Sequence, residues 1–183
     1  MQRITSLFLR AKHWQVFVLV WGTYFVGTMV LVGSVPEGPV ENPLKVGLLA
    51  EVVMLPSVVC LMGWLWPMGS FLVSISEPSL KLSIHYFRFA IVFPTLYLLT
   101  GLPIFLSRNS TVEATILLPL HLLAMFCLFY VFYFISKSLV IAEKCQAVTF
   151  NDYVFSLLLL FFSIIGIWLI QPRINRLYSR RDA

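Results

Sequence analysis

The sequence has few charged residues and few cysteines, and both shortages limit what the protein can be. Charged residues make up 11% of the chain, whereas about 25% is usual for a soluble domain. Hydrophobic residues make up 60%, more apolar surface than a soluble fold of 183 residues can bury. The cysteines, Cys60, Cys127 and Cys145, are odd in number and widely spaced, which argues against a disulfide framework.

Lysine and arginine are absent from five long apolar stretches. These are Trp14–Gly33, Val46–Trp66, Phe89–Leu106, Ile116–Ile135 and Tyr153–Ile170. A bilayer core of about 30 Å needs about 20 apolar residues in a helix, so each stretch is long enough to cross it. The loops between them are too short for a separate soluble domain. We therefore expect residues 1–183 to form one all-α domain, an integral membrane bundle of five transmembrane helices.

The positive charges conflict with five crossings. Lysine and arginine concentrate on the cytoplasmic side of a membrane protein, and five crossings put the two basic termini on opposite sides. Seven lysines and arginines would then lie on the amino-terminal side and six on the other. One re-entrant segment removes the conflict, and Val46–Trp66 is the weakest span because it carries Glu51 and Pro56. Four crossings with this segment re-entrant are the alternative, and the orientation stays open.

Several local signals lie outside the spans. Ile4, Leu7, Phe8 and Ala11 share one helical face, which predicts an amphipathic leader lying along the membrane surface. The fourth span continues without a breaker to Lys144, and the spacing of Thr149 and Asp152 predicts a capping box at the next helix. Gln171-Pro172 is expected to interrupt the last helix.

Aromatic residues near the span ends predict anchoring at the membrane interface. They are Trp14, Trp64, Trp66, Trp168 and Tyr153. Four arginines follow the last span, at positions 173, 176, 180 and 181, and predict binding to anionic lipid headgroups.

Polar residues within the spans suggest one layer at a common depth. Glu51 and His121 each lie five residues into a span that enters from the same side, about 7–8 Å deep. Thr28, Thr100 and Ser163, counted from the ends of the other three spans, fall near that depth. A Glu–His pair in a membrane can carry a proton or bind a cation. The alternative is that the two side chains satisfy each other and the hydroxyls bond to their own helices.

The segment Gly166–Asn175, which reads GIWLIQPRIN, carries a resemblance together with Trp64-x-Trp66 and residues from Pro119 onward. It resembles a family of small uncharacterised bacterial multi-pass membrane proteins. The resemblance implies a location in the bacterial inner membrane and no assigned activity. Besides His121, the positions that match the family pattern are Glu143, Asp152, Gln171, Pro172, Arg173 and Asn175.

No sequence motif supports a known catalytic class: HExxH, a Gly-rich phosphate loop and CxxC are all missing. We expect no catalytic residue, metal, cofactor or nucleic-acid partner. The first hypothesis is a non-enzymatic membrane component, an accessory or partner-binding subunit of a homo- or hetero-oligomer. The second is a small oligomeric transporter or channel that uses the layer of Glu51 and His121.

Overall fold

The computed structural model describes residues 2–34, 43–107 and 111–182, and within these ranges the chain forms helices and no strand. This confirms the predicted all-α class. The helices are α1 (Gln2–Arg10), α2 (His13–Phe17), the π-helical turn η1 (Val18–Gly22), α3 (Thr23–Ser34), α4 (Pro43–Ile75), the 3-10 turn η2 (Pro78–Leu80), α5 (Ile84–Ser107), α6 (Thr111–Lys144), α7 (Phe150–Phe161) and α8 (Ser163–Asp182).

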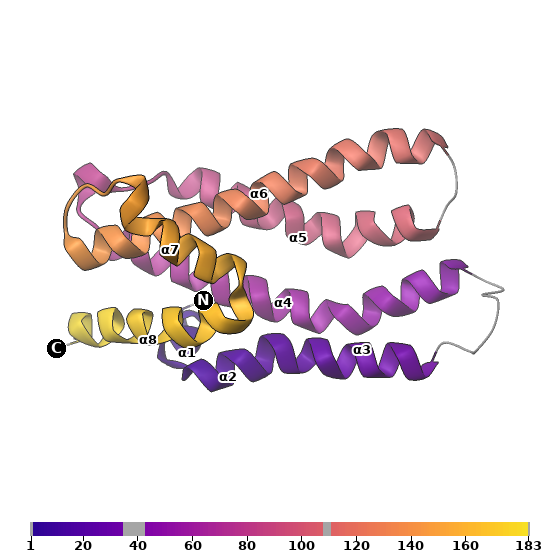
Figure 1. The fold of residues 1–183 in the computed structure, drawn as a ribbon, viewed down its shortest axis with the longest axis horizontal. Coiled ribbons are helices and arrows are strands. Elements are labelled where there is room, and N and C mark those ends of the chain that lie inside the picture. Colours follow the sequence, from indigo (N-terminus) through magenta and orange to yellow (C-terminus); the bar gives the residue numbers. More distant parts are fainter. Residues whose placement is uncertain (1, 35–42, 108–110, 183) are drawn as a thin grey trace.

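Four long helical segments run alternately up and down the length of the molecule: α2–η1–α3, α4, α5 and α6 (Figure 1). Three helices contain a stretch long and apolar enough to cross a membrane, namely His13–Ser34, Leu55–Ile75 and Leu118–Lys144. The fourth, α5, has 24 residues, and Ile84–Leu99 is its described apolar part. As predicted, α6 continues beyond the predicted span Ile116–Ile135 to Lys144.

The fifth predicted span is not one helix, because the chain reverses at its centre. Phe162 has φ −93° and ψ 59°, outside the helical region, and separates α7 from α8. α8 then runs back along α7 towards the end where α7 began (Figure 1). The continuous span Tyr153–Ile170 was therefore wrong. The alternative, in which Val46–Trp66 is the re-entrant segment, does not agree with the structure, because those residues lie within the unbroken helix α4.

A glycine allows the two arms of this α7–α8 hairpin to approach closely. A Cβ at Gly166 would lie 2.5 Å from the carbonyl carbon of Leu159, and closer still to its oxygen. The amide of Gly166 bonds to the carbonyl of Phe162 at 2.9 Å, so the helix restarts directly after the turn. At 1.5 Å per residue the 12 residues of α7 extend only about 18 Å, about three fifths of the thickness of a bilayer core.

The core lies where the hairpin packs on the carboxy-terminal halves of α4 and α6. Phe87 of α5 and Phe134 of α6, both fully buried, stack with ring centroids 4.5 Å apart. Gly69 of α4 makes room for this stack, because a Cβ there would come within 2.8 Å of Phe87 Cε1. The opposite half of the molecule exposes many large apolar side chains, such as Met29 and Phe126, at 74% and 71%. That exposure is what a lipid-facing surface requires.

The first long segment packs on α4 through small residues. A Cβ at Gly27 would lie 2.8 Å from the backbone oxygen of Val53, so the two helices are in backbone contact. One turn away, Thr23 Oγ1 lies 3.0 Å from Ser57 Oγ. Small residues four apart allow such close packing between helices in membranes.

The amino-terminal helix forms as predicted but does not lie free on a surface. α1 packs against α4 and α8, with Leu9 buried and Leu7 67% exposed. Of the predicted face, Phe8 and Ala11 pack against the core, whereas Leu7 is exposed. The reversal at Phe162 brings α8 beside α1.

Candidate functional site

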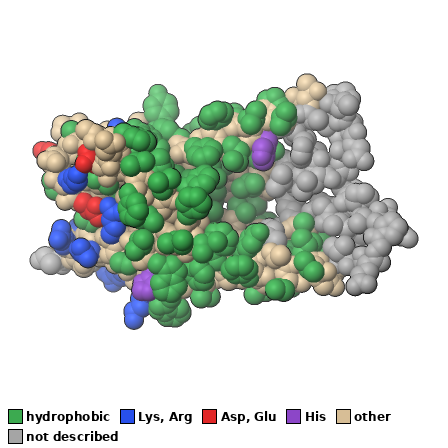
Figure 2. All heavy atoms as spheres, in the orientation of Figure 1, with side chains coloured by type: hydrophobic (Ala, Val, Ile, Leu, Met, Phe, Trp, Pro, Cys, Tyr) green, Lys and Arg blue, Asp and Glu red, His purple; other side chains and the backbone are tan. Residues whose placement is uncertain are grey.

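The polar side chains of Glu143, Asp152, Gln171, Arg173 and Asn175 lie at one end of the bundle, where the charged side chains gather (Figure 2). Gln171 of α8 is at the centre and is fully buried. Its Oε1 accepts a bond from Trp64 Nε1 of α4 at 2.7 Å. Its Nε2 lies within 2.9 Å of three acceptors: the backbone oxygens of Phe8 and Ala11 and Asn175 Oδ1. One buried amide thus joins α1, α4 and α8.

Asn175 completes the attachment of the amino-terminal segment. It lies one helical turn after Gln171, and its Nδ2 donates to the backbone oxygen of Ala11 at 3.1 Å. Ala11 directly follows the last residue of α1, where a carbonyl lacks a partner within its own helix. The two amides of α8 therefore replace the backbone bonds that the chain loses where α1 ends.

Arg173 joins α8 to two further helices. Its Nε and Nη2 donate to the two carboxylate oxygens of Glu143 in α6, at 2.7 and 2.5 Å, in a bidentate ion pair. Its Nη1 donates to the buried Ser156 Oγ of α7 at 2.8 Å. Such two-pronged pairing fixes geometry as well as charge. The predicted headgroup-binding arginine is thus partly occupied within the protein.

Asp152 joins the end of α6 to the start of α7. It pairs with Lys144 Nζ, and its Oδ2 accepts bonds from the Thr149 amide and hydroxyl at 2.7 and 2.8 Å. The predicted capping interaction between Thr149 and Asp152 is therefore present. The hydrogen bond from Lys144, together with those from Thr149, lowers the pKa of the Asp152 carboxyl to about 2.

Pro172 does not interrupt the helix, contrary to the prediction. α8 continues from Ser163 to Asp182 with Pro172 inside it and exposed. A proline in a helix removes one backbone donor and can kink the helix. Packing on both sides holds this helix together: Ile170 and Ile174 flank the proline and are buried.

Two aromatic residues predicted as interfacial anchors are buried instead. Trp64 is 1% exposed and donates to Gln171, and Tyr153 is 8% exposed. Trp14 and Trp168 remain 49% and 44% exposed, in keeping with their predicted positions. No pattern in the sequence indicates that Trp64, Ser156 and the carbonyls of Phe8 and Ala11 are the partners of these polar side chains. A buried Gln or Arg must be bonded, but nothing in the sequence names its partner.

Three of the five predicted members of the intramembrane layer, Thr28, His121 and Ser163, can be placed in the structure. Thr28 donates to the carbonyl of Tyr24 in its own helix at 2.9 Å. Ser163 lies directly after the reversal, so a depth counted from the end of a full crossing does not apply to it. The side chains of Glu51 and Thr100 lie outside the described residues. The pairing of Glu51 with His121 stays a prediction.

His121 packs against a buried tyrosine. The rings of Tyr97 and His121 meet edge to face with centroids 5.7 Å apart. Among the described residues the buried hydroxyl of Tyr97 finds no hydrogen-bond partner. In the part of the chain that the structure describes, no three His, Cys, Asp or Glu residues group as metal ligands.

The chain matches no protein-family model, and it finds no match among curated proteins or solved structures.

Proposed function

We propose that this chain crosses the membrane four times and adds a re-entrant hairpin, with both termini in the cytoplasm. The crossings are residues 13–34, 43–75, 84–107 and 111–144, and the hairpin is α7–α8. The distribution of positive charge supports this arrangement. With these crossings, eleven of the thirteen lysines and arginines belong to the end that carries both termini, and only Lys45 and Arg108 belong to the other. The eleven are Arg3, Arg10, Lys12, Lys81, Arg88, Lys137, Lys144, Arg173, Arg176, Arg180 and Arg181.

The positive-inside rule assigns the end with eleven positive charges to the cytoplasm. Five crossings divided the same charges seven to six, so the re-entrant hairpin removes the conflict in the sequence. Orientation is tested by thiol labelling of intact cells. Cys145, exposed between α6 and α7, should react only after the membrane is made permeable. A cysteine introduced at Ser34, the last residue of α3, should react from outside, with Cys60 and Cys127 replaced by alanine. Terminal tags accessible from opposite sides would contradict the proposal.

The function that this geometry supports best is a non-enzymatic membrane component that presents a rigid basic surface to a partner. The observation that supports the proposal is that the polar residues of the family-like pattern bond within the protein. Gln171, Arg173 and Asp152 bond to side chains and backbone of other helices, so they hold the cytoplasmic end together. Three other arginines of α8 are exposed: Arg176, Arg180 and Arg181. The resemblance to small multi-pass proteins of the bacterial inner membrane would agree with this location.

The experiment is purification from native membranes in a mild detergent, followed by identification of bound proteins. A stable complex is expected, and the double variant Arg176→Glu and Arg180→Glu should lose the partner. The matched control reverses Lys81 and Arg88, two exposed charges at the same end on another element. Equal loss in both variants would indicate a general charge effect, and recovery of only the free chain would contradict a partner-binding role.

The second candidate, a small oligomeric transporter, draws on the contact between Tyr97 and His121. A buried hydroxyl without a partner beside an imidazole is costly unless it meets water or a ligand. Proton uptake into liposomes tests this candidate. A flux that His121→Gln abolishes would favour transport, provided that the variant keeps the thermal stability of the wild type.

A further inference from the structure

A groove lies between α1 and the first long helix, beside the polar residues described above. It has a volume of about 530 Å³ and is open at the surface of the protein. Its polar lining comes from Ser6, Arg10 and Gln15, and its apolar lining includes Phe8, Ala11 and Leu19. Ala11 links the groove to the candidate site, because its carbonyl accepts bonds from Gln171 and Asn175.

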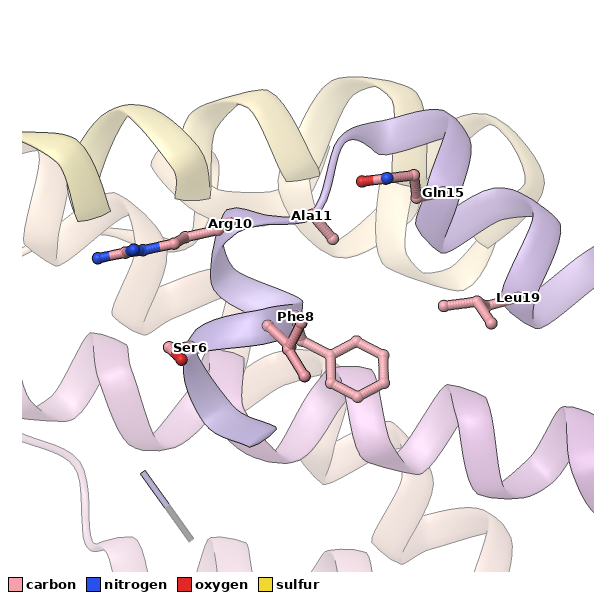
Figure 3. Close-up of a pocket in the computed structure, with 7 residues that line it drawn as sticks. Ser6, Phe8, Arg10, Ala11, Gln15 and Leu19 are labelled. Atoms are coloured by element: carbon pink, nitrogen blue, oxygen red, sulfur yellow. The ribbon is translucent and has the colours of Figure 1, made fainter. Parts of the chain in front are cut away.

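The groove changes in polarity along its length. Arg10 and Ser6 lie at one end, the ring of Phe8 lies in the middle and Leu19 lies at the far end (Figure 3). Leu19 is six residues beyond the start of α2, which places it about 9 Å deeper along the helix. Leu19 therefore lies deeper along this helix than the exposed Trp14 near its start, at a level where acyl chains are expected.

An irregular helical turn forms the apolar end. Leu19 belongs to the π-helical turn η1, a widening that is rare and often occurs at functional sites. The hydroxyl of Thr23 lies 2.6 Å from the carbonyl of Leu19 and 3.1 Å from that of Val20, so it satisfies carbonyl groups that a wide turn leaves poorly bonded. The widening is thus stabilised by a side chain, and it sets the position of Leu19 in the groove.

We infer that this groove binds one anionic glycerophospholipid of the cytoplasmic leaflet. The acyl chain lies against Phe8 and Leu19, and the phosphate lies at Arg10, with Lys12 exposed nearby. Complementarity of charge and polarity carries the assignment, since the described lining includes Arg10 and no acidic residue. The volume falls within the range of about 300–1,000 Å³ that is usual for ligand sites. Basic pockets between helices on the cytoplasmic side suit acidic headgroups.

The inference rests on the membrane placement proposed above but not on the partner. Native mass spectrometry of the full, delipidated chain in detergent tests it directly. The probes are palmitoyl-oleoyl phosphatidylglycerol and phosphatidylcholine, which share acyl chains and differ in headgroup. We expect one bound phosphatidylglycerol with an affinity at least about tenfold higher than that of phosphatidylcholine, the factor of one charge-assisted hydrogen bond.

Two variants, each with a matched control, test the polar end and the apolar end of the groove separately. Arg10→Gln should remove the preference for phosphatidylglycerol, whereas Arg180→Gln, with the same change of charge on the exposed part of α8, should keep it. Leu19→Trp should fill the apolar end and abolish binding of both lipids, whereas Val26→Trp, at a 65% exposed position, should not. Because Arg10 also packs over the ring of Tyr178 at 5.4 Å, Leu19→Trp keeps the test independent of that contact.

Equal affinity of the wild-type chain for the two lipids would overturn the headgroup assignment. Undiminished binding by Leu19→Trp would overturn the groove itself. Lipid stoichiometry in detergent depends on neither membrane orientation nor a protein partner. A failed labelling or co-purification experiment would therefore be distinguishable from failure of the lipid site.

Discussion

Substitution of Gly166 tests the helical hairpin most directly. Glycine is needed there because α8 returns in contact with the backbone of α7, not only with its side chains. A Cβ at position 166 would lie 2.5 Å from the carbonyl carbon of Leu159, whereas Cβ contacts shorter than 3.0 Å essentially do not occur. Gly166→Ala must therefore push the two helices apart by at least half an ångström, and a backbone carbonyl cannot rotate away as a flexible side chain can.

The cost follows from what lies beside the contact. Leu160 and Ile167 are both fully buried in the hairpin interface and lose close packing when the helices separate. Overpacking costs about 1–3 kcal/mol, and we expect about 3 kcal/mol here because the obstacle is backbone. For a chain of this length that free energy lowers the melting temperature by about 6–12 °C.

The assay is thermal unfolding in detergent, followed by tryptophan fluorescence, with Gly33→Ala as the matched control. Gly33 lies in α3, is exposed, and a Cβ there would meet nothing within 4 Å. The control should be neutral or gain up to about 1 kcal/mol from helix propensity. If Gly166→Ala melts at the same temperature as Gly33→Ala, the close return of α8 along α7 is wrong.

Three further outcomes follow from the packing and from the capping interaction. Gln171→Leu leaves the Trp64 indole N–H and two backbone carbonyls without this partner and should cost about 2–4 kcal/mol of stability in thermal unfolding. The control Gln146→Leu, at an exposed position in a loop, should change stability by less than about 0.5 kcal/mol. Gly27→Leu should lower stability and separate the first two long helices, and an unchanged melting temperature would refute their backbone contact. Folding lowers the pKa of the Asp152 carboxyl from 3.8 to about 2 and so favours its ionised form. The wild type should therefore be more stable than Asp152→Asn at pH 7, and this difference in stability should disappear as the pH falls through about 2. A difference that persists below that pH would contradict the capping role.

The helical class and the local signals at helix ends could be predicted from the sequence alone. Long apolar stretches without charge have few ways to satisfy their backbone other than helices, so composition is enough to predict the class. The capping pair of Thr149 and Asp152 and the extension of α6 to Lys144 depend on neighbours within a few residues. Such short-range patterns are visible in the sequence because the interacting groups lie within one or two helical turns.

The direction of the last apolar stretch was decided only by tertiary structure. Tyr153–Ile170 is as apolar as a crossing helix, and the sequence alone assigns no structural role to Gly166 within it. That Gly166 allows contact with Leu159 depends on a turn at Phe162 that no proline marks, and Ser163 directly after it is too weak a signal to predict a reversal. The lysines and arginines near both termini indicate an even number of crossings, because both termini then lie on the same side. Their distribution does not indicate which segment turns back.

The partners of the buried polar residues were likewise decided by the fold. A buried glutamine needs partners wherever it lies, and hydrophobic burial does not specify which helix supplies them. Gln171 meets Trp64 across 107 residues and the carbonyl of Phe8 across 163. The sequence therefore determined which segments are helical and apolar, whereas the reversal at Phe162 decided which polar groups come together, because it alone brings α8 back to α1, α4 and α6.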